Sequence, residues 1–324
     1  MASEQLFELR RRTFDTPQFH GIEFIEVEAK SIVNPVPGNY LPFNWTINPY
    51  RGCSHACVYC FARVTHTYMD MSAGKDFESK IVVKLNAPEL LRAKLRSKAW
   101  RGEHIAMGTA TDPYQRAEGR YKLMPGIIKA LTDYRNPFSI LTKGTLMMRD
   151  LDLLLSASEV TEVSTAFSIP TLDESAWRAS EPGTPHPRKR MEAVASLNRA
   201  GIPSGVMLAP VLPGLTDDLD GLKRVVDAAV AAGATHVTPI FLHLRPVVRE
   251  EYMGWLEREF PELVVSYERL YKRSAYGPQE ARNQLSRGVG ALLDEAGFKP
   301  GAKQLRPRRA ATKRSTEGEQ LTLL

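Results

Sequence analysis

Three cysteines, Cys53, Cys57 and Cys60, are the residues whose type and spacing most clearly indicate chemistry. They are the only cysteines of the 324-residue chain, and all three lie in the segment NPYRGCSHACVYCFAR. Because this segment contains Asn, Pro, Gly and Ser, we expect a loop that wraps the three thiolates around one metal centre. An iron–sulfur cube takes one cysteine per iron, so three cysteines leave one iron open to another ligand.

A zinc site is the alternative metal centre for this loop. A structural zinc ion usually has a closed set of four Cys and His ligands, and the nearest histidines are His55 and His66. His55 stands between two of the cysteines, where it could join the same tetrahedron only with strain, and His66 is expected on the helix after the loop. An odd number of cysteines without a secretory signal argues against a disulfide framework. The spacing therefore favours an iron–sulfur cluster over zinc.

The composition is typical of a soluble globular protein, with 43% hydrophobic and 25% charged residues. No apolar run reaches the roughly 18 residues of a membrane span, and the charged segment MASEQLFELRRRTFD contains no apolar signal region. These features predict a cytoplasmic protein with no membrane partner. The sequence has no G-x-S-x-G, G-x-x-x-x-G-K-[ST] or H-E-x-x-H motif, which argues against a hydrolase or a nucleotide enzyme of these types.

The net charge of +6 is concentrated in residues 299–324. This segment holds seven of the 43 basic residues and two of the 37 acidic ones, so the rest of the chain has a net charge of only +1. The seven are Lys299, Lys303, Arg306, Arg308, Arg309, Lys313 and Arg314. Few apolar residues accompany them, which predicts a disordered, solvated tail. A weak phosphate-binding arm is the alternative.

The elements that must position the cysteine loop alternate between strand-like and helix-like patterns. Strands are predicted at 44–48, 104–109, 138–142, 161–168, 204–209 and 235–242, with a further insertion or edge strand at 80–85. Helices are predicted at 87–100, 125–134, 145–158, 187–201, 217–233, 246–260 and 278–297, and Gly201 and Gly233 act as stop signals. Six such βα units fit either a partial barrel or a doubly wound sheet.

Polar or unusual segments follow several of the predicted strands. They are GTATDPYQ after the second strand, TKG after the third, SIPT after the fourth and APVLPGLTD after the fifth. In a parallel barrel the functional residues gather where strands end and βα loops begin. We therefore expect these segments to surround the cysteine loop.

The Cys-x3-Cys-x2-Cys spacing, with Tyr59 before the last cysteine, resembles the signature of the radical S-adenosylmethionine (radical SAM) superfamily. The segments NPYRGCSHACVYCFAR, TATD, LTK, FSI, EPGTPHPRKR and GIPSGVMLAPVLPG, within residues 48–215, resemble its spore photoproduct lyase-like branch. This resemblance implies a partial (β/α)6 TIM-like barrel over 44–298 with helices at its C-terminal end. Residues 1–43 would form an N-terminal extension packed on that core, and 299–324 the basic tail.

The same resemblance implies two cofactors, a 4Fe–4S cluster and S-adenosylmethionine. The open iron would bind the amino and carboxylate groups of S-adenosylmethionine, and an electron from the cluster would cleave it to a 5′-deoxyadenosyl radical. Such a radical must form where solvent is excluded. A flavodoxin or ferredoxin would be the electron donor.

The cofactor contacts that the resemblance implies are Tyr59, Thr111, Asp112, Lys143, Ser168, Glu181 and Arg190. Thr111 and Asp112 would bind the ribose and the methionyl amine, and Lys143 the carboxylate, since charge-assisted hydrogen bonds are the stronger ones. Two of these residues also have simpler interpretations. Asp112 could cap a turn before Pro113, and Lys143 could end a strand in solvent.

One position departs from the spore photoproduct lyase pattern. Those enzymes use a further cysteine near the end of the second strand as a hydrogen-atom donor, whereas this chain has Thr109 there and no fourth cysteine. A threonine O–H bond is too strong for that role. One interpretation is that 5′-deoxyadenosine or a tyrosine returns the hydrogen atom to the product radical. The other, which we favour, is that the substrate differs from that of spore photoproduct lyase. Nucleic acid is a possible partner, and a redox-sensing, nucleic-acid-binding module without catalysis is the alternative function.

Overall fold

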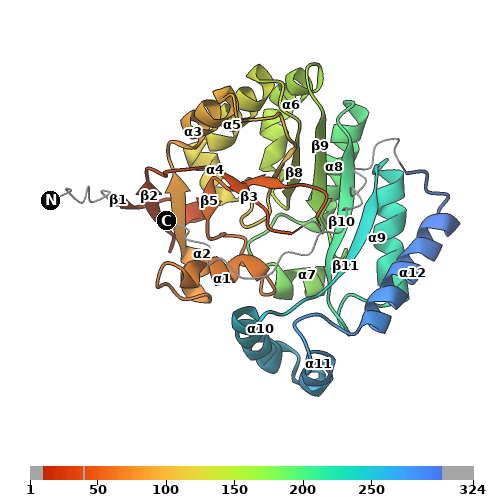
Figure 1. Cartoon of the computed structure of the whole chain (residues 1–324). Coiled ribbons are helices and arrows are strands. Elements are labelled where there is room, and N and C mark those ends of the chain that lie inside the picture. The colour runs from red at the N-terminus through yellow and green to blue at the C-terminus, as the bar shows by residue number, and fades with distance from the viewer. Residues whose placement is uncertain (1–9, 39–40, 301–324) are drawn as a thin grey trace.

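Six parallel strands form the centre of the computed structural model, which describes residues 10–38 and 41–300 (Figure 1). They are β4 (Trp45–Ile47), β7 (Ile105–Met107), β8 (Phe138–Thr142), β9 (Val163–Ser168), β10 (Ser204–Val211) and β11 (Val237–Phe241). The seven-stranded sheet has the order β11-β10-β9-β8-β7-β4-β3, in which β3 (Val33–Pro35) pairs antiparallel with β4. All six predicted barrel strands are confirmed.

The sheet is open rather than a closed barrel among the described residues. Its edges are β11 on one side and β3 on the other, and these two strands do not pair with each other. The predicted mixed α/β fold with a partial barrel is therefore confirmed. Parallel pairing in register, such as Ile105 opposite Phe138 and Phe138 opposite Val163, brings the carboxyl ends of the strands to one edge.

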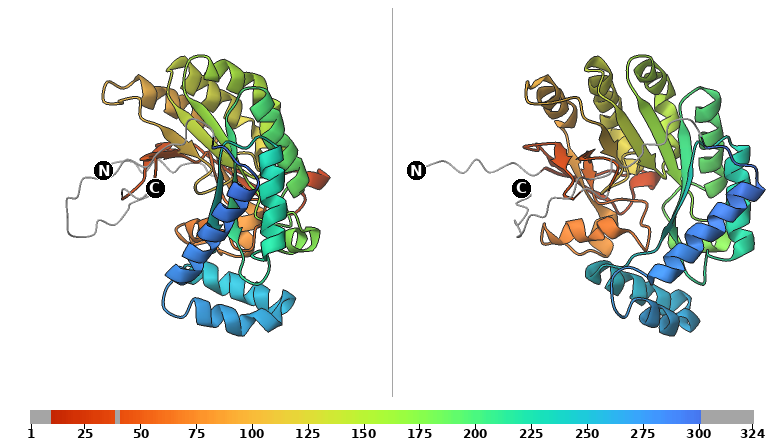
Figure 2. Two further views of the ribbon diagram at one scale, coloured as in Figure 1. Left: turned by 90° about the vertical axis from the view of Figure 1, so that its right-hand side faces the viewer. Right: turned by 45° about the vertical axis from the view of Figure 1, so that its right-hand side comes forward.

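Helices cover the outer face of this sheet (Figures 1 and 2). They include α3 (Ala87–Arg96), α4 (Arg116–Tyr121), α5 (Leu123–Asp133), α6 (Leu151–Ser158), α8 (Pro187–Arg199) and α9 (Leu219–Ala231). The last helix, α12 (Gln279–Glu295), packs against α9 and β11. Gly201 and Gly233 follow α8 and α9 with φ of 91° and 68°, so the predicted stop signals are confirmed.

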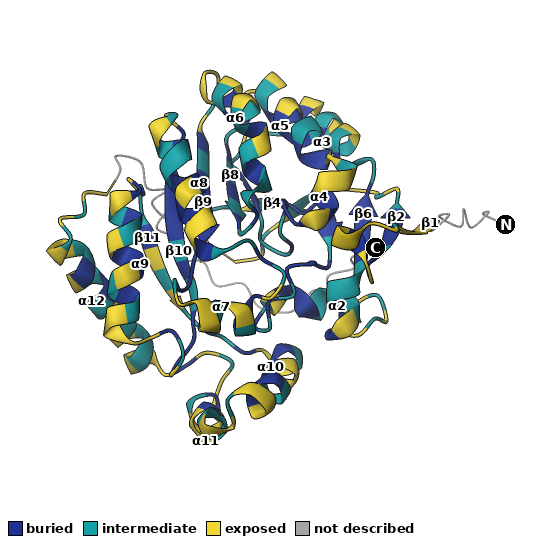
Figure 3. Cartoon of the chain, turned by 180° about the vertical axis from the view of Figure 1, so that it is seen from behind, coloured by how far each residue is buried: buried dark blue, intermediate teal, exposed yellow. Residues whose placement is uncertain are grey.

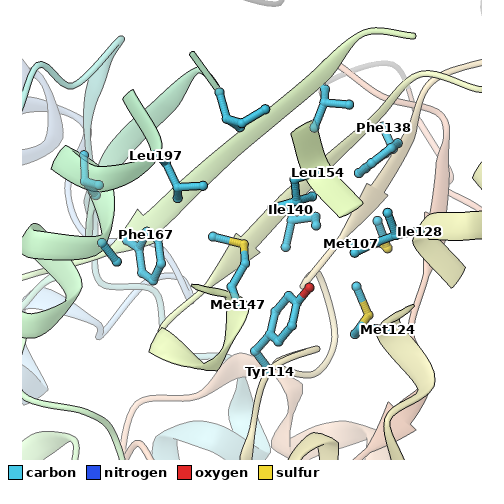
Figure 4. Packing of buried hydrophobic residues seen from close by; sticks show 14 of the residues in the cluster. Met107, Tyr114, Met124, Ile128, Phe138, Ile140, Met147, Leu154, Phe167 and Leu197 are labelled. Atoms are coloured by element: carbon cyan, nitrogen blue, oxygen red, sulfur yellow. The ribbon is translucent and has the colours of Figure 1, made fainter. Parts of the chain in front are cut away.

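The main apolar core lies between the sheet and these helices. Met107, Ile140 and Phe167 from the strands pack with Leu154 and Leu197 from the helices, and all five are buried (Figure 4). Figure 3 shows the matching pattern on the helices, whose inner faces are buried while their outer faces are exposed. This one-sided burial is what an amphipathic helix pattern predicts.

A second, four-stranded sheet lies beside the first, with the order β1-β2-β6-β5. Its strands are β1 (Arg10–Thr13), β2 (Glu23–Val27), β6 (Lys80–Lys84) and β5 (Tyr50–Arg51), and the helix α2 (Lys75–Ser79) precedes β6. The predicted extra strand at 80–85 is β6. Residues 10–38, from the predicted N-terminal extension, supply β1 and β2 to this sheet and β3 to the seven-stranded sheet.

Two helices, α10 (Pro246–Glu259) and α11 (Val264–Leu270), lie at the end of the sheet where the cysteine loop emerges. Tyr252 and Tyr267 from these helices share a buried apolar cluster with Cys57 and Tyr59. The predicted helical C-terminal region therefore closes the end of the sheet that carries the cysteines. No helix among the described residues is both long and apolar enough to span a membrane.

A chain that ends at Phe298 tests the prediction for the basic tail, which lies almost entirely outside the described residues. The Phe298 N–H donates a hydrogen bond to Leu293 O (2.9 Å) at the C-terminal end of α12, so this truncation retains the end of the helix. We expect its melting temperature to match that of the full chain. A chain that ends at Pro278 should unfold at a markedly lower temperature, because it loses the buried side chains of Val289 and Leu292. Unfolding of the first truncation would contradict the prediction.

Candidate functional site

The three cysteines follow β4 and β5 and face one cavity of about 210 Å³ at the carboxyl end of the parallel strands. Asp112 and Thr111 reach it from the loop after β7, Lys143 from the end of β8, and Ser168 from the end of β9. The segments that follow these strands therefore meet at the cysteine loop, as the sequence predicts. Tyr59 also lines the cavity, and apolar side chains such as Leu141, Met207 and Leu242 form much of its wall.

Backbone groups of the cysteine loop are satisfied by buried side chains from other elements. The Gln115 side chain accepts a hydrogen bond from Ser54 N–H (2.9 Å) and donates one to Gly52 O (2.9 Å). The Thr111 hydroxyl donates to the same carbonyl at 2.7 Å. Gly52 has φ of 78°, and a Cβ on it would lie 2.9 Å from Lys80 O, so only glycine fits there. Two side chains and one glycine thus fix the start of the loop.

Arg63 fixes the other end of the loop. Its guanidinium is buried and donates to Cys57 O (3.0 Å), Ala73 O (2.9 Å) and Gly74 O (3.1 Å), and it also pairs with Glu78. A guanidinium has five N–H donors in a rigid plane, so one arginine can connect these separate segments.

The loop that follows α7 (Glu174–Ser180) packs directly against the cysteine loop. Val58 N–H donates to Ser180 O and Gly183 N–H donates to His55 O, both at 3.0 Å. A Cβ on Gly183 would lie 2.2 Å from Ser54 O, so a larger residue would force the two loops apart. The predicted EPGTPHPRKR segment therefore contributes its backbone to the site.

Asp112 joins three parts of the site. Its carboxylate accepts hydrogen bonds from Thr142 Oγ1 (2.6 Å), Lys143 N–H (2.7 Å) and Tyr114 N–H (2.9 Å), and His55 Nδ1 lies 3.3 Å away. Burial alone would raise the pKa of Asp112, but His55, Thr142 and the Lys143 amide hold it at about 2. Asp112 is thus an ionised brace between the ends of β7 and β8 and the cysteine loop, and it also caps the turn at Pro113.

Lys143 belongs to a buried network of charges. Its ammonium lies 3.4 Å from Glu181 Oε1, donates to Ser168 Oγ and sits 5.6 Å above the centre of the Tyr59 ring. Glu181 also accepts hydrogen bonds from the Tyr59 hydroxyl and from Arg190. Burial alone would raise the pKa of Glu181, but Arg190 and Lys143 lower it to about 2. The network fixes Lys143 at the cavity wall, so it is not a solvated strand end.

Most of the sequence-predicted site residues gather around the cavity. Those that line it are Cys53, Cys57, Cys60, Tyr59, Thr111, Asp112, Lys143 and Ser168. Glu181 and Arg190 instead form a buried ion pair behind Tyr59 and Lys143, and neither lines the cavity. Sequence reasoning missed Gln115 and Arg63 as braces of the loop, although both stand in segments that it singled out.

Burial raises the pKa of all three cysteine thiols above its ordinary value. A bound cation such as iron is therefore needed to hold them as thiolates. Neither histidine expected as a zinc ligand is directed at the three cysteines, because His55 Nδ1 faces Asp112 and His66 Nε2 contacts Lys80 O at 2.9 Å. In residues 10–38 and 41–300, no three Cys, His, Asp or Glu side chains form a group that could hold a single metal ion. A cube that takes one thiolate per iron fits the three cysteines better.

Residues 47–226, more than half of the chain, match the family model described as the radical SAM superfamily. The chain belongs to the radical SAM superfamily. Its members are generally enzymes that typically use a 4Fe–4S cluster and S-adenosylmethionine. The match begins at the end of β4 and ends within α9, so it spans the cysteine loop and the ends of β7, β8, β9 and β10 at the cavity, but not the end of β11.

Relatives of this chain include two proteins described as uncharacterized. One from Mycobacterium tuberculosis is 50% identical over 283 residues, which cover 87% of this chain and 83% of that protein. One from Methanocaldococcus jannaschii is 31% identical over 261 residues, which cover 79% of this chain and 89% of that protein.

The radical SAM fold of this chain is also similar to solved structures of spore photoproduct lyase. One complexed with dinucleoside spore photoproduct superposes with a TM-score of 0.62 at 15% identity, over 86% of this chain and 80% of the other. A mutant with bound AdoMet and dinucleoside spore photoproduct gives a TM-score of 0.62 at 14% identity, over 91% and 86% of the two chains. At this identity the likeness establishes a shared fold.

Replacing Glu181 by Gln tests the buried charge network. The substitution keeps the side-chain shape but removes the charge that balances Arg190, whose side chain is 0% exposed. We expect the free energy of unfolding to fall by about 3–5 kcal/mol, measured by urea denaturation of the cluster-free protein. Glu174→Gln is the matched control, because its pair with Arg178 is exposed to solvent, and it should leave stability unchanged. Equal stability of both variants would contradict a structural role for the buried pair.

Proposed function

We propose that this protein cleaves S-adenosylmethionine reductively to methionine and a 5′-deoxyadenosyl radical, which then acts on a bound substrate. The observation that carries the proposal is the convergence of Cys53, Cys57 and Cys60 with Lys143 and Ser168 on one cavity. A 4Fe–4S cluster, when bound, would supply the electron and one open iron for this chemistry. Reduction by a flavodoxin or ferredoxin is part of the proposal.

Lys143 is the residue best placed to bind the carboxylate of S-adenosylmethionine. Its ammonium reaches the cavity from the end of β8, and Glu181 and Ser168 fix its position. An ammonium can donate three hydrogen bonds. The one from Lys143 Nζ to Ala209 O is long, at 3.5 Å, so the carboxylate of S-adenosylmethionine can replace it. The buried setting strengthens a charge-assisted hydrogen bond because water does not compete for it.

The remaining polar residues have supporting and binding roles in the proposal. Thr111 donates its hydroxyl hydrogen to Gly52 O, so its main role is to hold the cysteine loop. Asp112 accepts three hydrogen bonds and faces His55, which favours a brace over a direct contact with the methionyl amine. Ser168 and Tyr59 face the cavity and remain proposed cofactor contacts.

The apolar wall of the cavity suits a reactive radical, because Leu141, Met207 and Leu242 offer no water-binding groups and limit solvent. Thr109 also lines the cavity, where spore photoproduct lyases use a cysteine. We therefore propose a substrate or a hydrogen-return step that differs from theirs, with nucleic acid kept as a possible substrate class.

The test is to incubate the reconstituted, reduced protein with S-adenosylmethionine and to measure methionine and 5′-deoxyadenosine by chromatography. We expect both products, formed slowly when the substrate is absent. Lys143→Ala should raise the dissociation constant of S-adenosylmethionine about 10- to 150-fold by calorimetry, as expected for a lost charge-assisted contact of about 1.5–3 kcal/mol.

Lys129→Ala is the matched control for this measurement, because Lys129 is exposed on α5, away from the cavity. It should bind S-adenosylmethionine like the unchanged protein. A protein that holds an intact cluster but neither binds S-adenosylmethionine nor forms 5′-deoxyadenosine would overturn the proposal and favour a redox-sensing module.

A further inference from the structure

A second cavity lies between residues 14–19 and α4, and it is separate from the one at the cysteines. It is a groove of about 600 Å³ that shares no lining residue with the cysteine cavity. Phe14 and the buried Phe19 line it from one side, and Arg116 and Arg120 line it from one face of α4. Figure 3 shows α4 beside the strands of the four-stranded sheet, with exposed residues on its outer side. We call this cavity the α4 groove.

The α4 groove offers positive charge to a partner. Arg116 and Arg120 are exposed, and neither forms an ion pair with a described residue. Arg120 instead has its guanidinium 4.6 Å from the centre of the Phe14 ring. Asp15 is the one carboxylate among the described residues that line the groove, so two positive charges and one negative charge give a net charge of +1. An apolar floor edged by unpaired arginines complements a partner surface that is partly apolar and acidic.

An aromatic cluster fixes the floor of the α4 groove. The ring of Phe14 packs against three others, with centroids 5.9, 5.4 and 6.4 Å away in Phe19, Phe24 and Tyr121. Because these rings and a guanidinium of α4 surround Phe14, little of its face is left to stack a nucleic-acid base. The carboxylate of Asp15 would also repel a chain of phosphates. The groove therefore fits the acidic surface of a protein better than it fits a nucleic acid.

The α4 groove has a short connection to the first cysteine of the loop. Arg116 directly follows Gln115, whose side chain donates a hydrogen bond to Gly52 O and accepts one from Ser54 N–H, both at 2.9 Å. Gly52 and Ser54 stand on either side of Cys53. One residue with two hydrogen bonds thus joins the exposed surface of α4 to a thiolate that would hold the cluster. A bonded route of this kind couples a surface to a redox centre better than open space does.

We infer that the α4 groove is the docking surface for a small acidic electron-donor protein of the flavodoxin or ferredoxin class. This inference rests on the proposed function, to which it adds the surface that receives the reductant. One electron would leave the reduced centre of the donor and enter the cluster, and no bond would form or break. Because the groove is separate from the cysteine cavity, a docked donor leaves that cavity open to the substrate.

The test measures how fast a photoreduced flavodoxin reduces the cluster of the reconstituted protein, by electron paramagnetic resonance of rapidly frozen samples without S-adenosylmethionine. Arg116→Glu combined with Arg120→Glu should slow this reduction roughly tenfold at low salt, because charges at the rim of an interface mainly change the association rate. High salt should shrink the difference by screening the charges. Reduction by dithionite, which needs no docking surface, should be unchanged. The same variant should bind oxidised flavodoxin more weakly by calorimetry.

Two further variants control for the change of charge. Lys98→Glu combined with Arg101→Glu changes the net charge by the same amount on two exposed residues before β7, at the opposite end of the strands from the cysteines. It should be reduced by flavodoxin as fast as the unchanged protein. Asp15→Asn should be reduced faster, because it removes the negative charge that lines the groove.

The docking surface and the proposed function can fail separately. Equal reduction by flavodoxin of the double arginine variant and the unchanged protein would overturn the docking surface. Equally slowed reduction by dithionite would also overturn it, since the effect would then lie in the cluster. Binding of a single-stranded oligonucleotide through Arg116 and Arg120, with reduction by flavodoxin unaffected, would indicate a nucleic-acid surface in its place. Reduction that depends on both arginines in a protein that cannot cleave S-adenosylmethionine would instead overturn the proposed function.

Discussion

The site depends on one constraint, which is that a buried loop without regular structure must have its backbone groups satisfied. Three cysteines can surround a metal centre only if the chain between them turns tightly, and such a chain cannot pair its own N–H and C=O groups. Gln115 and Thr111 therefore bind Gly52, Arg63 binds Cys57 O, and Gly183 N–H binds His55 O. These contacts come from three segments, the loop after β7, the residues directly after Cys60 and the loop after α7, so the fold has to bring these segments together to hold the loop in place.

A second constraint is the balance of buried charge. Placing Lys143 at the end of β8 positions an ammonium beside the cysteines, but a lone buried cation is costly. Glu181 offsets that cost, and it also pairs with Arg190. The three side chains together have two positive charges and one negative charge, which leaves a net charge of +1. That remaining positive charge is what an anionic group on a bound cofactor would satisfy. The same arrangement explains why the EPGTPHPRKR segment packs against the cysteine loop although it lies over a hundred residues later in the chain.

The strands, the helices and the position of the cavity could be predicted because each depends on local pattern. Period-two and helical patterns marked β7 to β11 and the helices between them, and parallel strands necessarily bring their carboxyl ends together. The braces could not be predicted, because Gln115 and Arg63 are defined by contacts between distant segments that no local pattern records. Thr111 shows the difference well: its type and place suggested a cofactor contact, whereas its hydroxyl donates to Gly52 O.

The central claim is the proposal that the three cysteines would hold a cluster with one iron left open to S-adenosylmethionine. Electron paramagnetic resonance of the reduced, reconstituted protein, recorded with and without S-adenosylmethionine, tests it most directly. We predict the signal of one reduced 4Fe–4S cluster, with g values that change when S-adenosylmethionine is added, and no such signal from Cys57→Ala. A strong cluster signal that S-adenosylmethionine leaves unchanged, or stoichiometric zinc in a colourless folded protein, would contradict the account.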